Sequence, residues 1–118
     1  MKVMIAGYGD TGKAVHKIVY DADIVDFELG YPPIYEPALP RYEVILMCIP
    51  YLEKFEIIAR NYYAIYKPEA IIVFSDIPVE VCEDLGLYKC TMDGIVNVHP
   101  IQNDVVNEFL SIYFGIDD

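Results

Sequence analysis

Three glycines near the start of the chain have the spacing of a phosphate-binding turn. They lie in Gly7-Tyr8-Gly9-Asp10-Thr11-Gly12, between the apolar run 2–6 and a segment of helical periodicity. In a strand, turn and helix of this kind, the first glycine permits a tight turn, the second lets a phosphate approach the backbone, and the third lets helix and strand pack closely. The N-terminus of the helix then offers free N–H groups and a positive dipole end. We therefore expect residues 7–12 to hold the pyrophosphate of a dinucleotide.

An acidic residue at the end of the next strand would select the type of dinucleotide. Glu28 ends the predicted strand 24–28. A carboxylate at that position accepts hydrogen bonds from a ribose diol and repels a 2′-phosphate, so the cofactor expected is NAD, with NADP second. Asp26 is the competing acidic residue, but the expected register places it in mid-strand. We therefore predict Glu28 as the ribose ligand.

The same residues support a second nucleotide hypothesis, a P-loop. Gly7, Gly12 and Lys13 match the first positions of that motif. The motif next requires Ser or Thr, whose hydroxyl binds Mg²⁺, and this chain has Ala14. Asp76, which follows the apolar run 71–74, would imitate the second metal-binding carboxylate. The missing hydroxyl favours the dinucleotide over the P-loop.

Alternating strands and helices are predicted to position these residues. Short apolar runs typical of buried parallel strands cover 2–6, 24–28, 43–49, 70–74 and 94–98. Helical periodicity covers 11–20, 52–66, 78–85 and 104–114, with Asn103 as an N-cap and Gly86 and Gly115 as helix ends. Prolines 32, 33, 37 and 40 predict a loop over 29–41. The pattern predicts an α/β fold, a single doubly wound, Rossmann-like parallel sheet of about five strands with helices on both faces. Residues 1–118 are expected to form one dinucleotide-binding domain.

Composition narrows the choice of partners and compartment. A formal net charge of -11 repels phosphate backbones and anionic lipid, so neither nucleic acid nor a membrane is an expected partner. No apolar stretch approaches the roughly 18 residues that a membrane span requires. The three cysteines contain no C-x-x-C pair, so we expect a reduced, cytoplasmic protein without a metal site.

Four segments resemble the N-terminal NAD(P)-binding domain of the 6-phosphogluconate dehydrogenase-like superfamily, and prephenate dehydrogenases in particular. They are residues 1–12, Cys48-Ile49-Pro50, Val73-Phe74-Ser75-Asp76 and Val98-His99-Pro100-Ile101. The resemblance implies that Pro50 borders the nicotinamide and that Asp76 shapes the active site. It also implies that His99 lies beside the substrate and assists removal of a hydroxyl proton. The implied activity is hydride transfer by an NAD-dependent oxidoreductase, with His99 and Asp76 as catalytic residues.

The chain also departs from that family's pattern. Val79 stands where the family has a serine, and Gln102 and Asn103 replace a glycine-containing stretch after the His-Pro pair. No counterpart of the family's helical substrate domain follows within these 118 residues. A homodimer or a partner protein is therefore expected to complete any active site. The alternatives are a non-catalytic module that senses nucleotide or redox state, and a protein that uses the fold for interaction alone.

Overall fold

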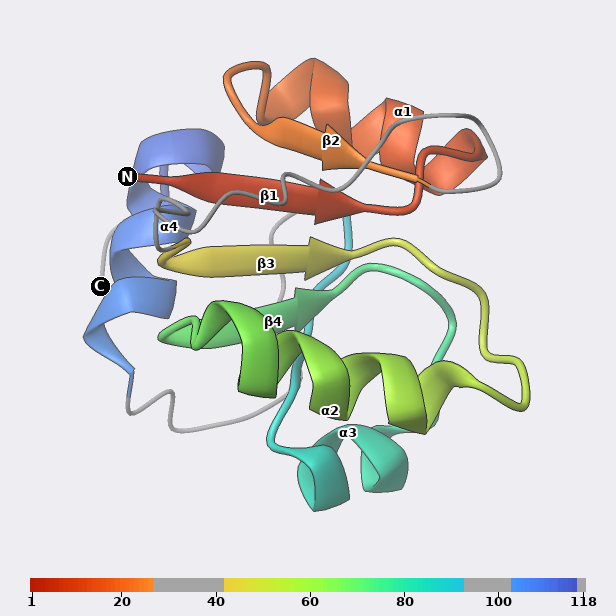
Figure 1. Ribbon diagram of the computed structural model, residues 1–118. Helices are drawn as coiled ribbons and strands as arrows, with labels where there is room; N and C mark the ends of the chain where they lie inside the picture. Colours follow the sequence, from red (N-terminus) through yellow and green to blue (C-terminus); the bar gives the residue numbers. More distant parts are fainter. Residues whose placement is uncertain (27–41, 93–102, 117–118) are drawn as a thin grey trace.

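A five-stranded parallel sheet forms the centre of the molecule (Figure 1). The computed structural model describes residues 1–26, 42–92 and 103–116. The strands are β1 (Val3–Ala6), β2 (Asp23–Val25), β3 (Val44–Met47), β4 (Ala70–Val73) and β5 (Tyr88–Lys89). They lie in the order β2-β1-β3-β4-β5, and every neighbouring pair is parallel. The predicted α/β fold is therefore confirmed.

The three central strands are apolar because both of their faces are covered. Every residue of β1, β3 and β4 is buried, as expected for a parallel sheet between two layers of helices. The register pairs Ala6 with Met47, and Met47 with Val73. The three strands therefore end side by side, at what we call the carboxyl edge of the sheet. The opposite side, where the strands begin, is the amino edge.

Two helices pack on each face of the sheet (Figure 1). The helices are α1 (Asp10–Ile18), α2 (Phe55–Tyr66), α3 (Val79–Leu85) and α4 (Asp104–Phe114). Val15 of α1 and Phe109 of α4 share a core with Ile5 of β1. Phe55 of α2 and Cys82 of α3 share the other core with Met4 of β1. Alternate residues of one strand thus face different helix pairs, which is the doubly wound arrangement.

Helix ends were predicted more accurately than the shorter strands. Gly86 and Gly115 end α3 and α4 in the left-handed conformation, and the Asn103 side chain caps α4, as expected. The strand β5 was not predicted. The expected strand 94–98 and loop 29–41 lie outside the described residues. No helix in the described part of the chain is long and apolar enough to span a membrane.

The strand order reverses between β1 and β3. The chain passes from β1 to β2 on one side, and from β3 to β4 and β5 on the other. In open α/β sheets, ligands bind outside the carboxyl ends of the strands at such a reversal. The residues that directly follow β1 and β3 are therefore the first place to look for a site.

Candidate functional site

The turn after β1 is short and contains two of the three glycines. It consists of Gly7, Tyr8 and Gly9, because β1 ends at Ala6 and α1 begins at Asp10. Gly7 has a φ of 95°, which side chains rarely adopt. A Cβ at this position would lie 3.0 Å from the carbonyl oxygen of Cys48, which follows β3. Gly7 is therefore required both by its backbone conformation and by close contact with the neighbouring strand.

Gly12 is required for a different reason. It lies in the first turn of α1, and a Cβ there would lie only 2.0 Å from the Gly7 carbonyl oxygen. That atom belongs to the backbone and cannot rotate away. The absence of a side chain at Gly12 thus allows the start of α1 to pack directly against the turn.

Gly9 differs from both, because no backbone of the described residues crowds the position of its missing side chain. Apart from its chain neighbours Tyr8 and Asp10, no described residue has an atom within 4 Å of a Cβ built at Gly9. Its φ of -78° is open to any residue, so the backbone does not require glycine here. Gly9 is the N-cap of α1, and no side chain caps the first turn. The first amides of a helix have no acceptor within the helix, so this end can receive an anion.

The acidic residue nearest to this turn is Asp26. Two residues of the expected strand, 27 and 28, lie outside the described residues. The described β2 runs from Asp23 to Val25 and is directly followed by Asp26. Its Oδ2 accepts a hydrogen bond from the backbone N–H of Tyr8. A carboxylate therefore stands at the end of β2, next to the glycine turn.

The side chain of Tyr8 lies along α1. Its hydroxyl is 2.8 Å from Nδ1 of His16, and the two rings meet edge to face with centroids 5.5 Å apart. Nε2 of His16 is 3.2 Å from the carbonyl oxygen of Tyr20. His16 is partly buried and links the glycine turn to the segment just after α1.

The segment after β3 contacts the end of β1, next to the glycine turn. The N–H of Cys48 donates to the carbonyl of Ala6, and Cys48 is buried. Burial raises the pKa of its thiol to about 12, so the group stays protonated at neutral pH and does not act as a nucleophile. Pro50 is exposed, two residues further along the same edge, and its carbonyl accepts the N–H of Leu52 at 2.9 Å.

The end of β4 brings two more polar side chains to this edge. Ser75 is buried, and its hydroxyl has no hydrogen-bond partner among the described residues. The Asp76 carboxylate is fully exposed and lies 3.7 Å from Nζ of Lys89. Lys89 also donates to the carbonyl of Ile77 at 2.7 Å. Asp76 is thus held at the surface by a lysine of β5.

Two of the predicted site residues lie outside the described ranges. These are Glu28, the expected ribose ligand, and His99, the expected catalytic histidine. The other predicted residues, 7–12, Pro50 and Asp76, all follow strands that end at the carboxyl edge. Asp26 and His16 both contact Tyr8, and these contacts could not be predicted because no sequence spacing indicates them.

The geometry does not support the P-loop hypothesis. A P-loop encloses the phosphate within the loop that precedes its helix. Here α1 begins at Asp10, so Gly12 and Lys13 are already helical and the connecting turn is only residues 7–9. Asp76 is paired with Lys89 at the surface. Within residues 1–26, 42–92 and 103–116, no group of three His, Cys, Asp or Glu side chains is arranged to hold a metal ion.

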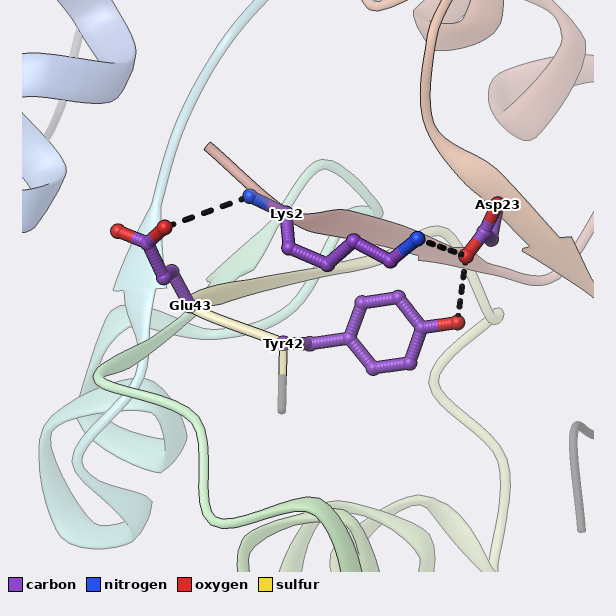
Figure 2. A network of polar contacts seen from close by, with 4 residues as sticks. All are labelled: Lys2, Asp23, Tyr42 and Glu43. Carbon is purple, nitrogen blue, oxygen red and sulfur yellow. Dashed lines mark hydrogen bonds and ion pairs between the residues drawn. The ribbon is translucent and has the colours of Figure 1, made fainter. Parts of the chain in front are cut away.

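The amino edge carries a network of a different character (Figure 2). The Tyr42 hydroxyl donates to Oδ2 of Asp23 at 2.7 Å, and Nζ of Lys2 lies 3.3 Å from the same oxygen. The backbone N–H of Lys2 donates to Glu43 at 3.4 Å. Tyr42 is completely buried, and this burial, followed by its bond to Asp23, raises the pKa of its hydroxyl. These contacts tie the beginnings of β1, β2 and β3 together.

Comparison with known proteins adds no further assignment. No family model, no curated protein and no solved structure matches the chain. The resemblance to the 6-phosphogluconate dehydrogenase-like superfamily therefore rests on the short motifs given above.

Proposed function

We propose that this chain binds a nicotinamide dinucleotide, NAD, at the turn between β1 and α1. The observation that carries the proposal is the space at Gly9. The fold needs glycine at positions 7 and 12, where a Cβ would meet backbone, but it does not need glycine at position 9. A glycine that packing does not explain, at an uncapped helix N-terminus and at the reversal of strand order, suits the close approach of a diphosphate.

In this proposal the chain's own backbone would hold the pyrophosphate. The amides of Asp10, Thr11 and Gly12 form the first turn of α1. Hydrogen bonds from such amides to a charged group contribute more than those between neutral groups, roughly 1.5–3 kcal/mol each. When bound, the nicotinamide group would supply a site for hydride exchange.

Asp26 is the first candidate for the adenosine ribose, with Glu28 as the alternative. Asp26 stands directly after β2 and already contacts the turn through the Tyr8 N–H. A carboxylate has about four acceptor sites, so one that accepts from a backbone N–H can also accept from a ribose hydroxyl. Its negative charge would oppose a 2′-phosphate, which supports NAD over NADP.

Binding is proposed here without a specific reaction. Of the two residues to which the resemblance gives catalytic roles, His99 lies outside the described residues and Asp76 is paired with Lys89 at the surface. A non-catalytic sensor of nucleotide or redox state would need only the binding turn. An oxidoreductase would need a homodimer or a partner protein to complete the site, and we propose a cytoplasmic location for either.

Calorimetric titration of the protein with NADH, NADPH and ATP with Mg²⁺ tests this proposal. We expect heat of binding with NADH, weaker binding with NADPH, and none with ATP and Mg²⁺. Binding of ATP alone would support the P-loop hypothesis, and no binding of any of the three would overturn nucleotide binding altogether.

The matched variants Asp26→Asn and Glu28→Gln then identify the ribose ligand. Each removes one negative charge and keeps an oxygen acceptor. We expect Asp26→Asn to lower the affinity for NADH and to reduce the ratio between the affinities for NADH and NADPH. Glu28→Gln should bind both with affinities close to those of the wild type. The opposite result would return the role to Glu28.

A further inference from the structure

The Tyr8 side chain is held at both of its ends. Its backbone N–H donates to Asp26, and its hydroxyl lies 2.8 Å from Nδ1 of His16, two helical turns into α1. Tyr8 stands between Gly7 and Gly9, so its side chain is the one that the turn itself carries. The ring lies along α1, with its centroid 5.5 Å from that of the His16 ring.

The contacts of His16 define its tautomer. The carbonyl oxygen of Tyr20 can only accept a hydrogen bond, so Nε2 of His16, 3.2 Å away, must carry the proton. In the neutral imidazole Nδ1 is then an acceptor, and the Tyr8 hydroxyl donates to it. The result is a directed chain from the Tyr8 hydroxyl, through the imidazole, to the carbonyl of Tyr20 just beyond the end of α1.

We propose that His16 is a positioning residue for the dinucleotide turn, which it keeps open by holding the Tyr8 ring against α1. This inference rests on the proposed function. Lys13 of α1 also contacts this ring, since its Nζ lies 6.0 Å from the centroid of the Tyr8 ring. Holding a side chain in the conformation needed for binding lowers the entropic cost of binding, so release of the ring weakens affinity without removing any group that touches the ligand.

Two variants break the contact in complementary ways. Tyr8→Phe keeps the ring and removes the hydroxyl, and His16→Phe keeps an aromatic neighbour and removes both hydrogen bonds. His16→Asn is the rescue variant, because its amide oxygen can accept from the Tyr8 hydroxyl in place of Nδ1. Tyr113→Phe is the matched control, since it removes a tyrosine hydroxyl that donates to Asp21 at 2.9 Å, far from the turn in sequence.

The test measures the affinity for NADH of the full chain and of the four variants, beside their stability in urea. We expect Tyr8→Phe and His16→Phe each to lower the affinity for NADH by about threefold to tenfold, the cost of immobilising one released side chain on binding. His16→Asn should recover part of this loss. The double variant Tyr8→Phe with His16→Phe should be no weaker than either single variant, because both remove one contact. Tyr113→Phe should bind as wild type does.

A ligand-free measurement accompanies the titrations. The ¹⁵N shifts of the His16 ring should report a proton on Nε2 and an acceptor at Nδ1, and Tyr8→Phe should shift the Nδ1 signal. Equal affinity of the wild type and both Phe variants, or a proton on Nδ1 of the neutral ring, overturns this inference and leaves nucleotide binding intact. Absence of NADH binding by the wild-type chain overturns the proposed function and the inference with it.

Discussion

The two edges of the sheet differ in how their polar groups are paired. At the amino edge, polar groups are satisfied by the protein itself: Lys2, Asp23 and Tyr42 bind one another, and Asn103 caps α4 while donating to the carbonyl of Glu69. At the carboxyl edge, α1 begins at Gly9 without a side-chain cap, and the buried Ser75 hydroxyl has no partner among the described residues. Buried polar groups are normally paired, so the second edge is the exceptional one.

The N-termini of α1 and α4 show this difference most clearly. The Asn103 side chain accepts from the amides of Val105 and Val106 at 3.0 and 3.1 Å, which closes the start of α4. Gly9 has no side chain with which to close α1. Because α1 and α4 pack on the same face of one sheet, the difference comes from the capping residue and the edge at which each helix begins. The helices α2 and α3, which begin after strands that end at the carboxyl edge, likewise have no side-chain cap, so the closed start of α4 is the exception among the four described helices.

The largest effect should come from Gly12→Ala. Its Cβ would lie 2.0 Å from the Gly7 carbonyl oxygen, so α1 and the turn must separate. We expect a loss of at least about 3 kcal/mol in the free energy of unfolding, the upper range for overpacked sites. Urea denaturation followed by circular dichroism measures it. A loss below about 1 kcal/mol would mean that α1 does not pack on the turn as described.

Asn103→Ala tests the closed end of α4. It removes the side-chain oxygen that accepts two amide hydrogen bonds, and loss of such a cap costs about 1 kcal/mol. The same denaturation experiment should show this loss, while the affinity for NADH stays unchanged. A change in affinity would contradict the separation of the two edges.

Ser75→Ala is the matching substitution at the carboxyl edge. It removes a buried hydroxyl that has no partner in the described part of the chain. Relief of an unpaired buried group should leave stability unchanged or raise it by up to about 1 kcal/mol. Replacement by alanine is therefore expected to lower the free energy of unfolding at Asn103, and to leave it unchanged or raise it at Ser75. A clear loss of stability would show that the Ser75 hydroxyl is bonded in solution.

The smallest effect is expected from Asp10→Asn. Asp10 is exposed in the first turn of α1, where a negative charge stabilises the helix dipole by roughly 0.3–1 kcal/mol and repels a bound anion by a similar amount. The variant should lose that stability and bind NADH about two- to fivefold more tightly. Titration at low and high salt provides the check, because salt screens such exposed charges and should reduce the gain.

Much of the framework could be predicted from sequence because it depends on local pattern. Continuous apolar runs indicated β1, β3 and β4, whose residues are all buried. Asn103 and Gly115 marked the ends of α4 because capping depends on one residue's own chemistry.

Features set by tertiary contacts were not predictable in the same way. The strand β2 pairs with β1 as far as Val25 opposite Ala6, after which β1 turns at Gly7. That turn brings Asp26 beside Tyr8, a contact that hydrophobic patterning does not indicate. The strand β5 has two residues, too few for a periodic signal. The link between Tyr8 and His16 likewise depends on how the turn folds back along α1.

The most direct test of this account is Gly9→Ala, measured for both NADH affinity and free energy of unfolding. Apart from the two chain neighbours of Gly9, no described residue has an atom within 4 Å of the added Cβ, so stability should stay within about 0.5 kcal/mol of wild type. The affinity for NADH should fall at least about tenfold, because the methyl group would hold the pyrophosphate away from the amides of α1. Unchanged stability with unchanged NADH affinity would contradict the claim that the open space at Gly9 is a binding site.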